Sequence, residues 1–397
     1  MTTNTQHIPS GYKLSPLGII PEDWEVKRLG EIGEVLMCKR IMKYQTDSRG
    51  DIPFFKIGTF GGKADAYISR EVFDEYKTKY SYPKVGDVLI SAAGTIGRSV
   101  IFDGTPSYYQ DSNIVWIDND NKQVLNKYLY YYYSTINWIT DTGTIPRLYN
   151  GALKAIQIPT PPIEQQTRIV SILELWDTAI AKQSALIEQL TLRKRGLMQQ
   201  LLTGKKRLKG FEGEWKEVRL GDIAQITMGQ SPDSRFYNER GEGLPLIQGN
   251  ADIKDRKSIQ RIWTSSVTKA CECNDIIMSV RAPVGEIAIA TQKSCIGRGV
   301  CSITSTNVDA EYLFQLLLLL EDSWGNIEQG GTFTSINSQE IQKKKVFIPK
   351  QSEQIAIATI LTLADKEIET QKQKLAAMQE QKKGLMQVLL TGKRRIK

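Results

Sequence analysis

Histidine is nearly absent from this chain of 397 residues, which contains only His7. A single histidine excludes a catalytic triad or a metal site built on several imidazoles. The five cysteines stand at irregular spacing and do not form a disulfide framework. The longest apolar run, 313–320, is too short to span a bilayer and contains Gln315. The first residues show no apolar stretch of signal-peptide type, and we expect a cytoplasmic protein.

Motifs that would give the chain its own chemistry are also missing. There is no G-x-x-x-x-G-K-[ST] loop for a nucleotide, no glycine-rich fingerprint for S-adenosylmethionine, and no Asn-Pro-Pro-aromatic motif of an amino-methyltransferase. Cys271, Cys273, Cys295 and Cys301 could hold zinc, but their spacing is not C-x-x-C. We therefore expect free thiols, no metal, and a binding protein without an active site.

The chain repeats itself at an offset of 188 residues. Residues 161–209 align with 349–397 without a gap, and 21 of the 49 pairs are identical. The repeat continues more weakly upstream, where GDVLISAAGTIG from Gly86 matches NDIIMSVRAPVG from Asn274. A fixed self-similarity of this kind indicates a tandem duplication. Each repeat is a diverged domain followed by a well-matched segment.

The well-matched segment is predicted to be a helix of about 40 residues, with glycine after each end at Gly204 and Gly392. Its apolar residues recur at spacings of four and three, as in a heptad seam. These residues are Ile169, Leu173, Trp176, Ile180, Ile187, Leu190, Leu197 and Leu201 in the first copy, and Ile357, Leu361, Ala364, Ile368, Leu375, Met378, Leu385 and Leu389 in the second. Such a narrow, long seam predicts that the two helices pack on each other.

Polar residues interrupt both seams at equivalent places. Gln183 and Gln371 are interpreted as residues that fix the register of the pair. Lys194 and Lys382 are interpreted as side chains that reach solvent at a splayed end. Parallel packing would bring the two lysines together, whereas antiparallel packing separates them. This charge argument, together with the connectivity, predicts an antiparallel coiled coil with a pseudo-twofold axis.

The diverged segments are predicted to be mixed α/β (α+β) domains, because short β-rich runs such as DVLISAAG and DIIMSV end at glycine, aspartate or asparagine. The expected parts are a first domain at 1–160, a first helix at 161–209, a second domain at 210–348 and a second helix at 349–397. Three residues recur in both domains and are interpreted as turn and strand-end residues: Asp87, Ser91 and Gly97, which match Asp275, Ser279 and Gly285.

Positive charge is concentrated in the two helical segments, at +5 each, against +1 for 1–160 and −3 for 210–348. The seven basic residues within 193–209 exceed what a helix dipole requires and predict a polyanionic partner such as DNA. Near-neutral domains can still read bases, because readout needs only a few placed side chains. The candidates are Lys56, Thr95, Arg98, Gln110 and Arg147 in the first domain, and Arg256, Lys257, Arg281 and Arg298 in the second.

The chain resembles the specificity subunits of Type I restriction-modification systems over nearly its full length. The motifs that carry the resemblance are LGIIPEDWEVKRLGEI from Leu17, MGQSP from Met228, GTIPRLYNGALKAIQIPTPPIEQQ from Gly143, IPKQSEQIAI from Ile348, and the endings LMQQLLTGK and LMQVLLTGK. The resemblance implies two target-recognition domains that each read one half of a bipartite site on double-stranded DNA. The strong divergence between the two domains implies that the half-sites differ.

The resemblance also implies partners and the location of the cofactors. The paired helices would act as a spacer and dock two methyltransferase subunits, and translocase/nuclease subunits would join them. S-adenosylmethionine, ATP and magnesium would then be bound by those subunits, with no cofactor, catalytic residue or membrane partner for this chain. Two alternatives remain: the specificity subunit of a related two-component restriction enzyme without a translocase, and a coiled-coil scaffold that does not bind DNA.

Overall fold

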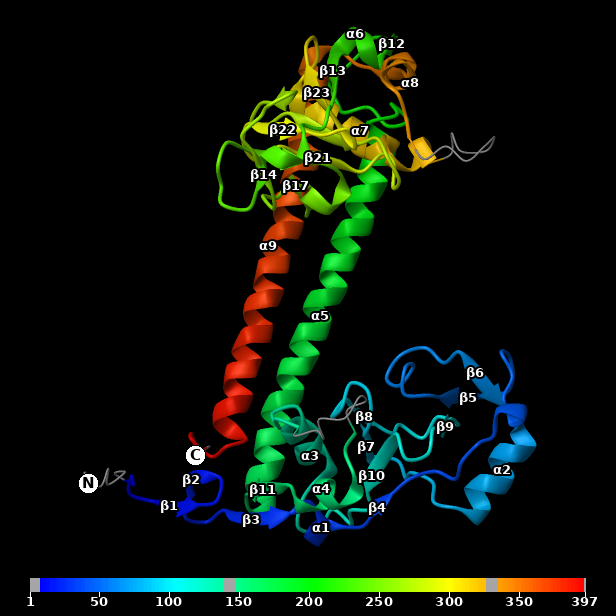
Figure 1. The fold of residues 1–397 in the computed structure, drawn as a ribbon, viewed down its shortest axis with the longest axis vertical. Coiled ribbons are helices and arrows are strands. Elements are labelled where there is room, and N and C mark those ends of the chain that lie inside the picture. The colour runs from blue at the N-terminus through cyan, green and yellow to red at the C-terminus, as the bar shows by residue number, and fades with distance from the viewer. Residues whose placement is uncertain (1–7, 139–146, 326–334, 396–397) are drawn as a thin grey trace. The chain divides into compact units, whose positions relative to one another are not determined.

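The computed structural model describes residues 8–138, 147–325 and 335–395. It divides the chain into two compact units, and each unit draws on both halves of the sequence (Figure 1). The first unit contains residues 1–183 and 374–397, and the second contains 184–373. Two long helices, α5 (Ile163–Leu201) and α9 (Gln351–Leu389), therefore contribute one part to each unit. The boundaries predicted at 161 and 349 lie two residues before these helices begin.

The described residues of the first unit's globular part form four small sheets. Strands β4, β10, β7 and β8 form the largest sheet in that order, β6-β5-β9 form a second, and β11-β3 and β1-β2 form two-stranded ladders. The elements are β1 (Tyr12–Ser15), β2 (Gly18–Pro21), β3 (Glu25–Arg28), α1 (Leu29–Ile32), β4 (Val35–Leu36), β5 (Ile52–Phe55), β6 (Ala66–Ile68), α2 (Arg70–Lys79), β7 (Val88–Ser91), β8 (Ser99–Ile101), β9 (Tyr108–Tyr109), β10 (Ile114–Ile117), α3 (Asn126–Tyr133), α4 (Asn150–Ala155) and β11 (Gln157–Thr160).

The second unit enlarges the same plan. Its six-stranded sheet has the order β13-β23-β20-β21-β17-β16, a five-stranded sheet has the order β14-β18-β15-β22-β19, and β12 pairs with β24. The elements are β12 (Lys216–Arg219), α6 (Leu220–Ile223), β13 (Ala224–Met228), β14 (Tyr237–Asn238), β15 (Leu244–Ile247), β16 (Ile253–Lys254), β17 (Lys257–Ser258), β18 (Trp263–Thr264), β19 (Ala270–Cys271), β20 (Ile276–Ser279), β21 (Ile287–Ile289), β22 (Ser294–Ile296), β23 (Val300–Ser305), α7 (Ala310–Gly325), α8 (Ser338–Lys343) and β24 (Lys345–Ile348).

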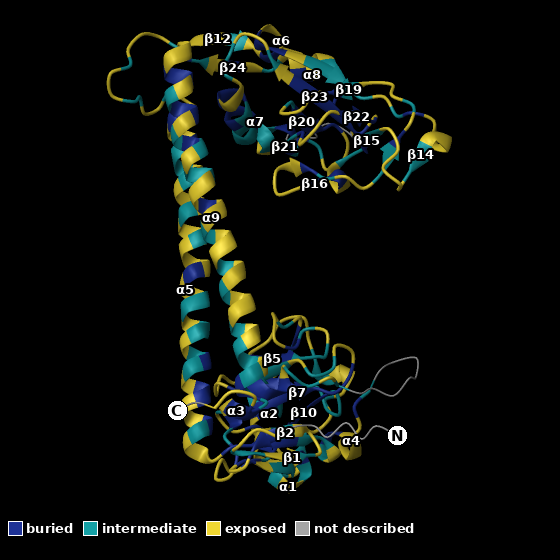
Figure 2. Cartoon of the chain, turned by 90° about the vertical axis from the view of Figure 1, so that its left-hand side faces the viewer, coloured by how far each residue is buried: buried dark blue, intermediate teal, exposed yellow. Residues whose placement is uncertain are grey.

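The two units share a four-strand arrangement, with β4-β10-β7-β8 corresponding to β13-β23-β20-β21. Their central strands β7 and β20 are buried along their whole length, which explains why both read as continuous apolar runs (Figure 2). The helix α3 or α7 packs beside this sheet, and its aromatic or leucine side chains enter the core. The prediction of mixed α/β domains is confirmed.

The long helices run antiparallel, as two ion pairs establish. In the first unit, Asp177 of α5 pairs with Lys382 of α9. In the second unit, Lys194 of α5 pairs with Asp365 of α9, with 2.6 Å between Nζ and Oδ1. The partner number falls as the number along α5 rises, which only an antiparallel pair allows. The predicted antiparallel coiled coil is confirmed.

The basic tail that ends both repeats is a core element. Leu201 and Leu202, at the end of α5, are buried in the core of the second unit, which also contains Ile357 near the start of α9. Leu389 and Leu390, at the end of α9, are buried in the core of the first unit. The end of the first repeat's helix therefore completes the second unit, and the end of the second repeat's helix completes the first unit.

A buried glutamine joins the start of each long helix to its own unit. Gln166 of α5 accepts a hydrogen bond from the Leu125 amide at 2.8 Å, just before α3 begins. Gln354 of α9 accepts one from the Asp309 amide at 2.9 Å, just before α7 begins. Both glutamine side chains also donate to a proline carbonyl that precedes their own helix. These bonds satisfy buried polar groups. They join α5 to the start of α3 in the first unit and α9 to the start of α7 in the second.

None of the helices in the described part of the chain combines the length and the apolar character that a membrane span requires.

The reciprocal packing predicts which unit each helix end stabilises. Leu390→Ala should destabilise the first unit, and the equivalent Leu202→Ala the second, each by about 3 kcal/mol because the lost side chain leaves a cavity. Hydrogen exchange of the full-length chain measures this loss. For Leu390→Ala, the amide exchange rates within residues 8–138 should increase. An increase confined to the last turn of α9 would show that this end is not part of the first unit's core.

Candidate nucleic-acid interface

A tight turn follows the central strand of the first unit and is organised by one serine. Ser91 Oγ, at the end of β7, donates to the Thr95 carbonyl and accepts from the Arg98 amide at 2.9 Å. Gly97 lies in the left-handed region at φ +83°, and a Cβ there would clash with Trp138. The turn therefore requires glycine at this position. It leaves the side chains of Thr95 and Arg98 on the surface.

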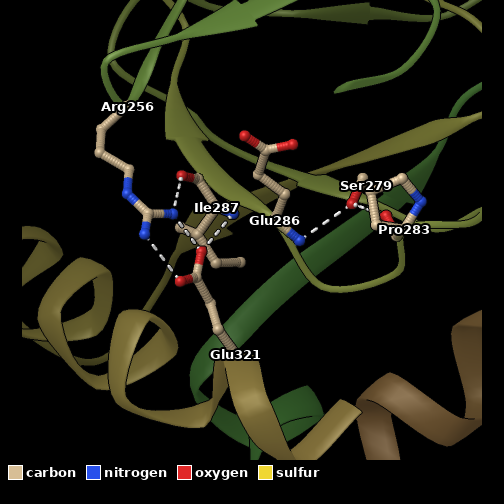
Figure 3. A network of polar contacts seen from close by, with 6 residues as sticks. All are labelled: Arg256, Ser279, Pro283, Glu286, Ile287 and Glu321. Carbon is tan, nitrogen blue, oxygen red and sulfur yellow. Dashed lines mark hydrogen bonds and ion pairs between the residues drawn. The ribbon is translucent and has the colours of Figure 1, made fainter. Parts of the chain in front are cut away.

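The second unit has the same turn after β20. Ser279 Oγ donates to the Pro283 carbonyl at 2.7 Å and accepts from the Glu286 amide at 2.9 Å (Figure 3). Gly285 takes φ +96°, and a Cβ there would press on Trp324. The four positions that define this turn, Ser279, Pro283, Gly285 and Glu286, lie 188 residues after their counterparts. The recurring serine and glycine are turn residues, as interpreted from the sequence.

The first unit gathers its candidate residues around the loop between β5 and β6. The Arg98 guanidinium donates to the Phe60 carbonyl at 2.8 Å. The Gln110 side-chain oxygen accepts from the Ile57 amide at 3.0 Å. Lys56 stands in the same loop and forms an exposed ion pair there at 2.9 Å. Arg98 and Gln110 thus each use one polar group to hold the loop in place, and their contact with DNA stays a prediction.

Arg147 joins the same cluster from a distant part of the sequence. It forms an isolated antiparallel bridge with Ala93, inside the turn. Its guanidinium lies 5.9 Å from the ring centroid of the exposed Tyr149. All five candidates of the first unit therefore lie in the turn or the loop beside it, or contact one of them.

The candidates of the second unit are spread more widely. Arg281 is exposed inside the turn, where it forms an isolated bridge with Ser335. Arg298 has an exposed side chain, and its amide donates to Ser231 Oγ at 3.1 Å. Lys257 is exposed in β17, near the edge of the six-stranded sheet. These three side chains remain predictions for DNA contact.

Arg256 instead holds its own unit together. Its guanidinium binds both carboxylate oxygens of Glu321 in α7 and donates to the Ile287 carbonyl at 3.2 Å (Figure 3). The same carboxylate accepts from the Ile287 amide at 2.7 Å. This pair engages both terminal nitrogens of the guanidinium, while the Arg256 side chain remains 49% exposed. The geometry therefore gives Arg256 a structural role, and its contact with DNA stays a prediction.

The two turns differ in charge at their last position. Arg98 in the first unit corresponds to Glu286 in the second. Both residues are fixed through their amides by the same serine, so their side chains leave equivalent points of the fold. One turn thus offers a hydrogen-bond donor where the other offers an acceptor.

A polar triad connects α3 to the helix pair in the first unit. Asp177 of α5 accepts from Lys382 of α9 and from the Tyr131 hydroxyl at 2.7 Å. The Lys382 ammonium lies 5.1 Å from the centroid of the Tyr131 ring. Burial, reinforced by the Asp177 carboxylate, raises the pKa of Tyr131, so its hydroxyl stays protonated and donates.

The second unit repeats this triad with one change. Asp365 of α9 accepts from Lys194 of α5 at 2.7 Å and from the side-chain Nε2 of Gln315 in α7 at 2.8 Å. The Lys194 side chain is only 12% exposed. The interpretation of Lys194 and Lys382 as solvent-reaching residues at a splayed end was wrong, because each is largely buried and paired across the seam.

Sequence reasoning missed the two aspartates of these triads. Asp177 and Asp365 are identical residues at the repeat offset, one position after the seam residues Trp176 and Ala364. Lysines at seam positions of an antiparallel pair need acids on the facing helix, so this signal was available. Gln183 is buried and Gln371 half-buried, and their register role stays a prediction.

Ion pairs also account for part of the basic tail. Arg207, after α5, binds both carboxylate oxygens of the buried Glu353 at 2.7 Å and lies over Trp215. Arg195 pairs with Asp322 at 3.4 Å. Together with Lys194, three of the seven charges within 193–209 are matched inside the unit. The case for a polyanion bound along the tail is correspondingly weaker than the sequence indicated.

The cysteines form no metal site. All five are free, and Cys273 alone is exposed. Burial raises the pKa of Cys271 to about 11 and that of Cys301 to about 12, so both remain unreactive thiols. In residues 8–138, 147–325 and 335–395 there is no group of three or more His, Cys, Asp or Glu that could hold a metal ion.

Comparison with known proteins explains the duplication. Residues 21–192 and 212–379 each match the family of type I restriction modification DNA specificity domains. The chain belongs to this family. A protein of Methanocaldococcus jannaschii described as a type I restriction enzyme MjaX specificity subunit is 32% identical over 97% of both chains. A specificity subunit of Haemophilus influenzae is 64% identical over 160 residues, which are 40% of this chain and 42% of that one.

Solved structures carry the same fold. A chain from a type I restriction-modification system is similar with a TM-score of 0.63 at 23% identity, over 94% of this chain and 99% of that chain. The S subunit of the M. genitalium type I system gives a TM-score of 0.57 at 16% identity, over 92% and 96%. The resemblance inferred from the sequence motifs is confirmed, and with it the identification as a specificity subunit without catalytic activity.

The triads predict a specific cost of removing their negative charge. Asp365→Asn keeps an acceptor for Gln315 but leaves the largely buried Lys194 ammonium unpaired. We expect a loss of about 1–2 kcal/mol from the second unit, below the value for a fully buried pair because Asp365 is 41% exposed. Calorimetric unfolding of the full chain measures this loss.

The matched double variant is Lys194→Met with Asp365→Asn, which removes the stranded cation from the seam. It should recover most of the lost stability. A double variant no more stable than Asp365→Asn alone would show that the ion pair is not what stabilises this part of the seam.

Proposed function

We propose that the chain reads a bipartite target on double-stranded DNA, with one half-site read by each unit. The observation that carries the proposal is the duplicated turn, which places a polar side chain at the same point of both units, the exposed Arg98 in the first and the half-buried Glu286 in the second. Membership in a family of DNA specificity domains supports DNA as the ligand. The chain supplies recognition only, and the chemistry belongs to other subunits.

The two half-sites are expected to differ. Arg98 can donate to guanine, whereas Glu286 at the equivalent point can accept from the amino group of cytosine. The segments around the two turns have also diverged, since the second unit has the five-stranded sheet β14-β18-β15-β22-β19 where the first has the three strands β6-β5-β9. An identical pair of half-sites would need similar loops.

The long helices are proposed as the spacer between the half-sites. Each contains 39 residues, or about 60 Å at 1.5 Å per residue, which corresponds to about 17 base pairs at 3.4 Å. Allowing for the reach of the recognition domains, we expect half-site centres about 10–15 base pairs apart with unread bases between them. Gln183 and Gln371 would fix this distance by fixing the register.

Two methyltransferase subunits are the proposed partners on the helices. Leu175 of α5 and Leu363 of α9 are 70% and 58% exposed, and they stand at equivalent positions of the two repeats. One such leucine in each unit supports two equivalent docking sites. These subunits would bring S-adenosylmethionine, and translocase/nuclease subunits would bring ATP and magnesium. The complex would act in the cytoplasm, where its DNA is.

Exchange of one recognition domain tests this function. Residues 210–348 are replaced by the corresponding segment of another subunit, while Met198, Leu201 and Leu202 remain as the host's contribution to the core. Mapping of methylated bases, in cells that carry the complete system, should then show one changed half-site and one unchanged half-site. A change in both halves, or a continuous target, would contradict the proposal. Exchange of 1–160 is the matched control and should change the other half.

A further inference from the structure

Both units contain one isolated bridge at the same place. Ala93 bridges Arg147 in the first unit, and Arg281 bridges Ser335 in the second. Both members of the second bridge lie 188 residues after those of the first. Each unit therefore has one arginine on this bridge, but the arginine comes from opposite sides of it. Alignment of the repeats pairs Arg147 with a serine and Arg281 with an alanine, which hides the relation.

The backbone around the bridge is equivalent in the two units. The Leu148 amide donates to the Ala92 carbonyl at 2.8 Å, and the Ile336 amide donates to the Val280 carbonyl at 2.9 Å. These four residues are buried, so they anchor the bridge to the core. Partners in an antiparallel bridge project their side chains from the same face, with Cβ atoms about 5 Å apart. The two arginines thus leave their units from the same position.

Both guanidiniums are available to a ligand. Arg281 is exposed and Arg147 half-buried. Within the described residues, neither of them forms an ion pair, in contrast to Arg256 with its bidentate Glu321. Arg147 lies over the Tyr149 ring, a contact that leaves its donors unoccupied. An arginine that is already paired would have to leave its carboxylate before it could bind an anion, whereas these two form no ion pair with the described residues and present the planar donor set that suits a phosphate.

We propose that the bridge arginine, Arg147 or Arg281, anchors each unit to a DNA phosphate. This inference rests on the proposed function. The choice of phosphate over base follows from the duplication itself. Two unlike half-sites present different bases but the same backbone, so a contact retained at one position in both units suits the backbone. At the last turn position, Arg98 of the first unit corresponds to Glu286 of the second, and this difference is what a base contact would require.

The second unit provides the test, because Ser335 is exposed and accepts a larger side chain. The probe is a duplex that the wild-type full-length chain enriches from a randomised pool. Arg281→Ala should weaken binding to it and make the dependence of log K on log salt shallower by about 0.9. The preferred bases should not change. Arg281→Ala with Ser335→Arg recreates the arrangement of the first unit, and it should restore both the affinity and the salt slope.

The matched control is Lys269→Ala, which removes the same charge from an exposed residue that is not part of the bridge and should leave the affinity nearer to that of the wild type. Wild-type affinity and slope in Arg281→Ala, or failure of Ser335→Arg to restore them in a folded protein, would overturn the inference. Altered base preference in Arg281→Ala would also overturn it, because it would identify a base contact. If the wild-type chain enriches no sequence at all, the proposed function fails instead.

Discussion

The rest of this structure depends on one constraint. The C-terminal end of each long helix is buried in the same core as the first turns of the other long helix. Leu202 packs in one core with Ile357 and Leu361 of α9, and Leu390 packs in one core with Ile169 and Leu173 of α5. A single repeat, cut after its own helix, would leave one of these cores unfinished. The duplication is therefore cooperative: two repeats are needed before either unit is complete.

Polar contacts turn this apolar packing into a defined geometry. The buried glutamines at the helix starts, and the Lys-Asp triads further along, each tie a domain helix to the long helices. Every one of these side chains has a partner on another element, so a shift of register would strand a buried charge or amide. Apolar seams alone would tolerate such a shift. A recognition subunit needs this rigidity, because the placement of its reading side chains decides which bases it accepts.

The sequence predicted the parts of the molecule that repeat. The heptad seam, the glycine stops and the antiparallel direction all follow from residues that are identical or equivalent in both copies. The partners of Lys194 and Lys382 could have been predicted, since Asp177 and Asp365 recur at the same offset. The structural role of Arg256 could not, because Glu321 lies in a different element and the pair has no counterpart in the first unit. Arg147 and Arg281 were both predicted as candidates, but their equivalence was not, since the arginine changes sides of the bridge between the copies.

The central claim is that one chain recognises two unlike half-sites separated by bases that it does not read. Selection of binding sites from a randomised duplex pool by the complete complex tests it most directly. The account predicts two enriched blocks of different sequence, separated by an unenriched gap of one fixed length. A single continuous motif, or two blocks separated by a variable gap, would contradict it.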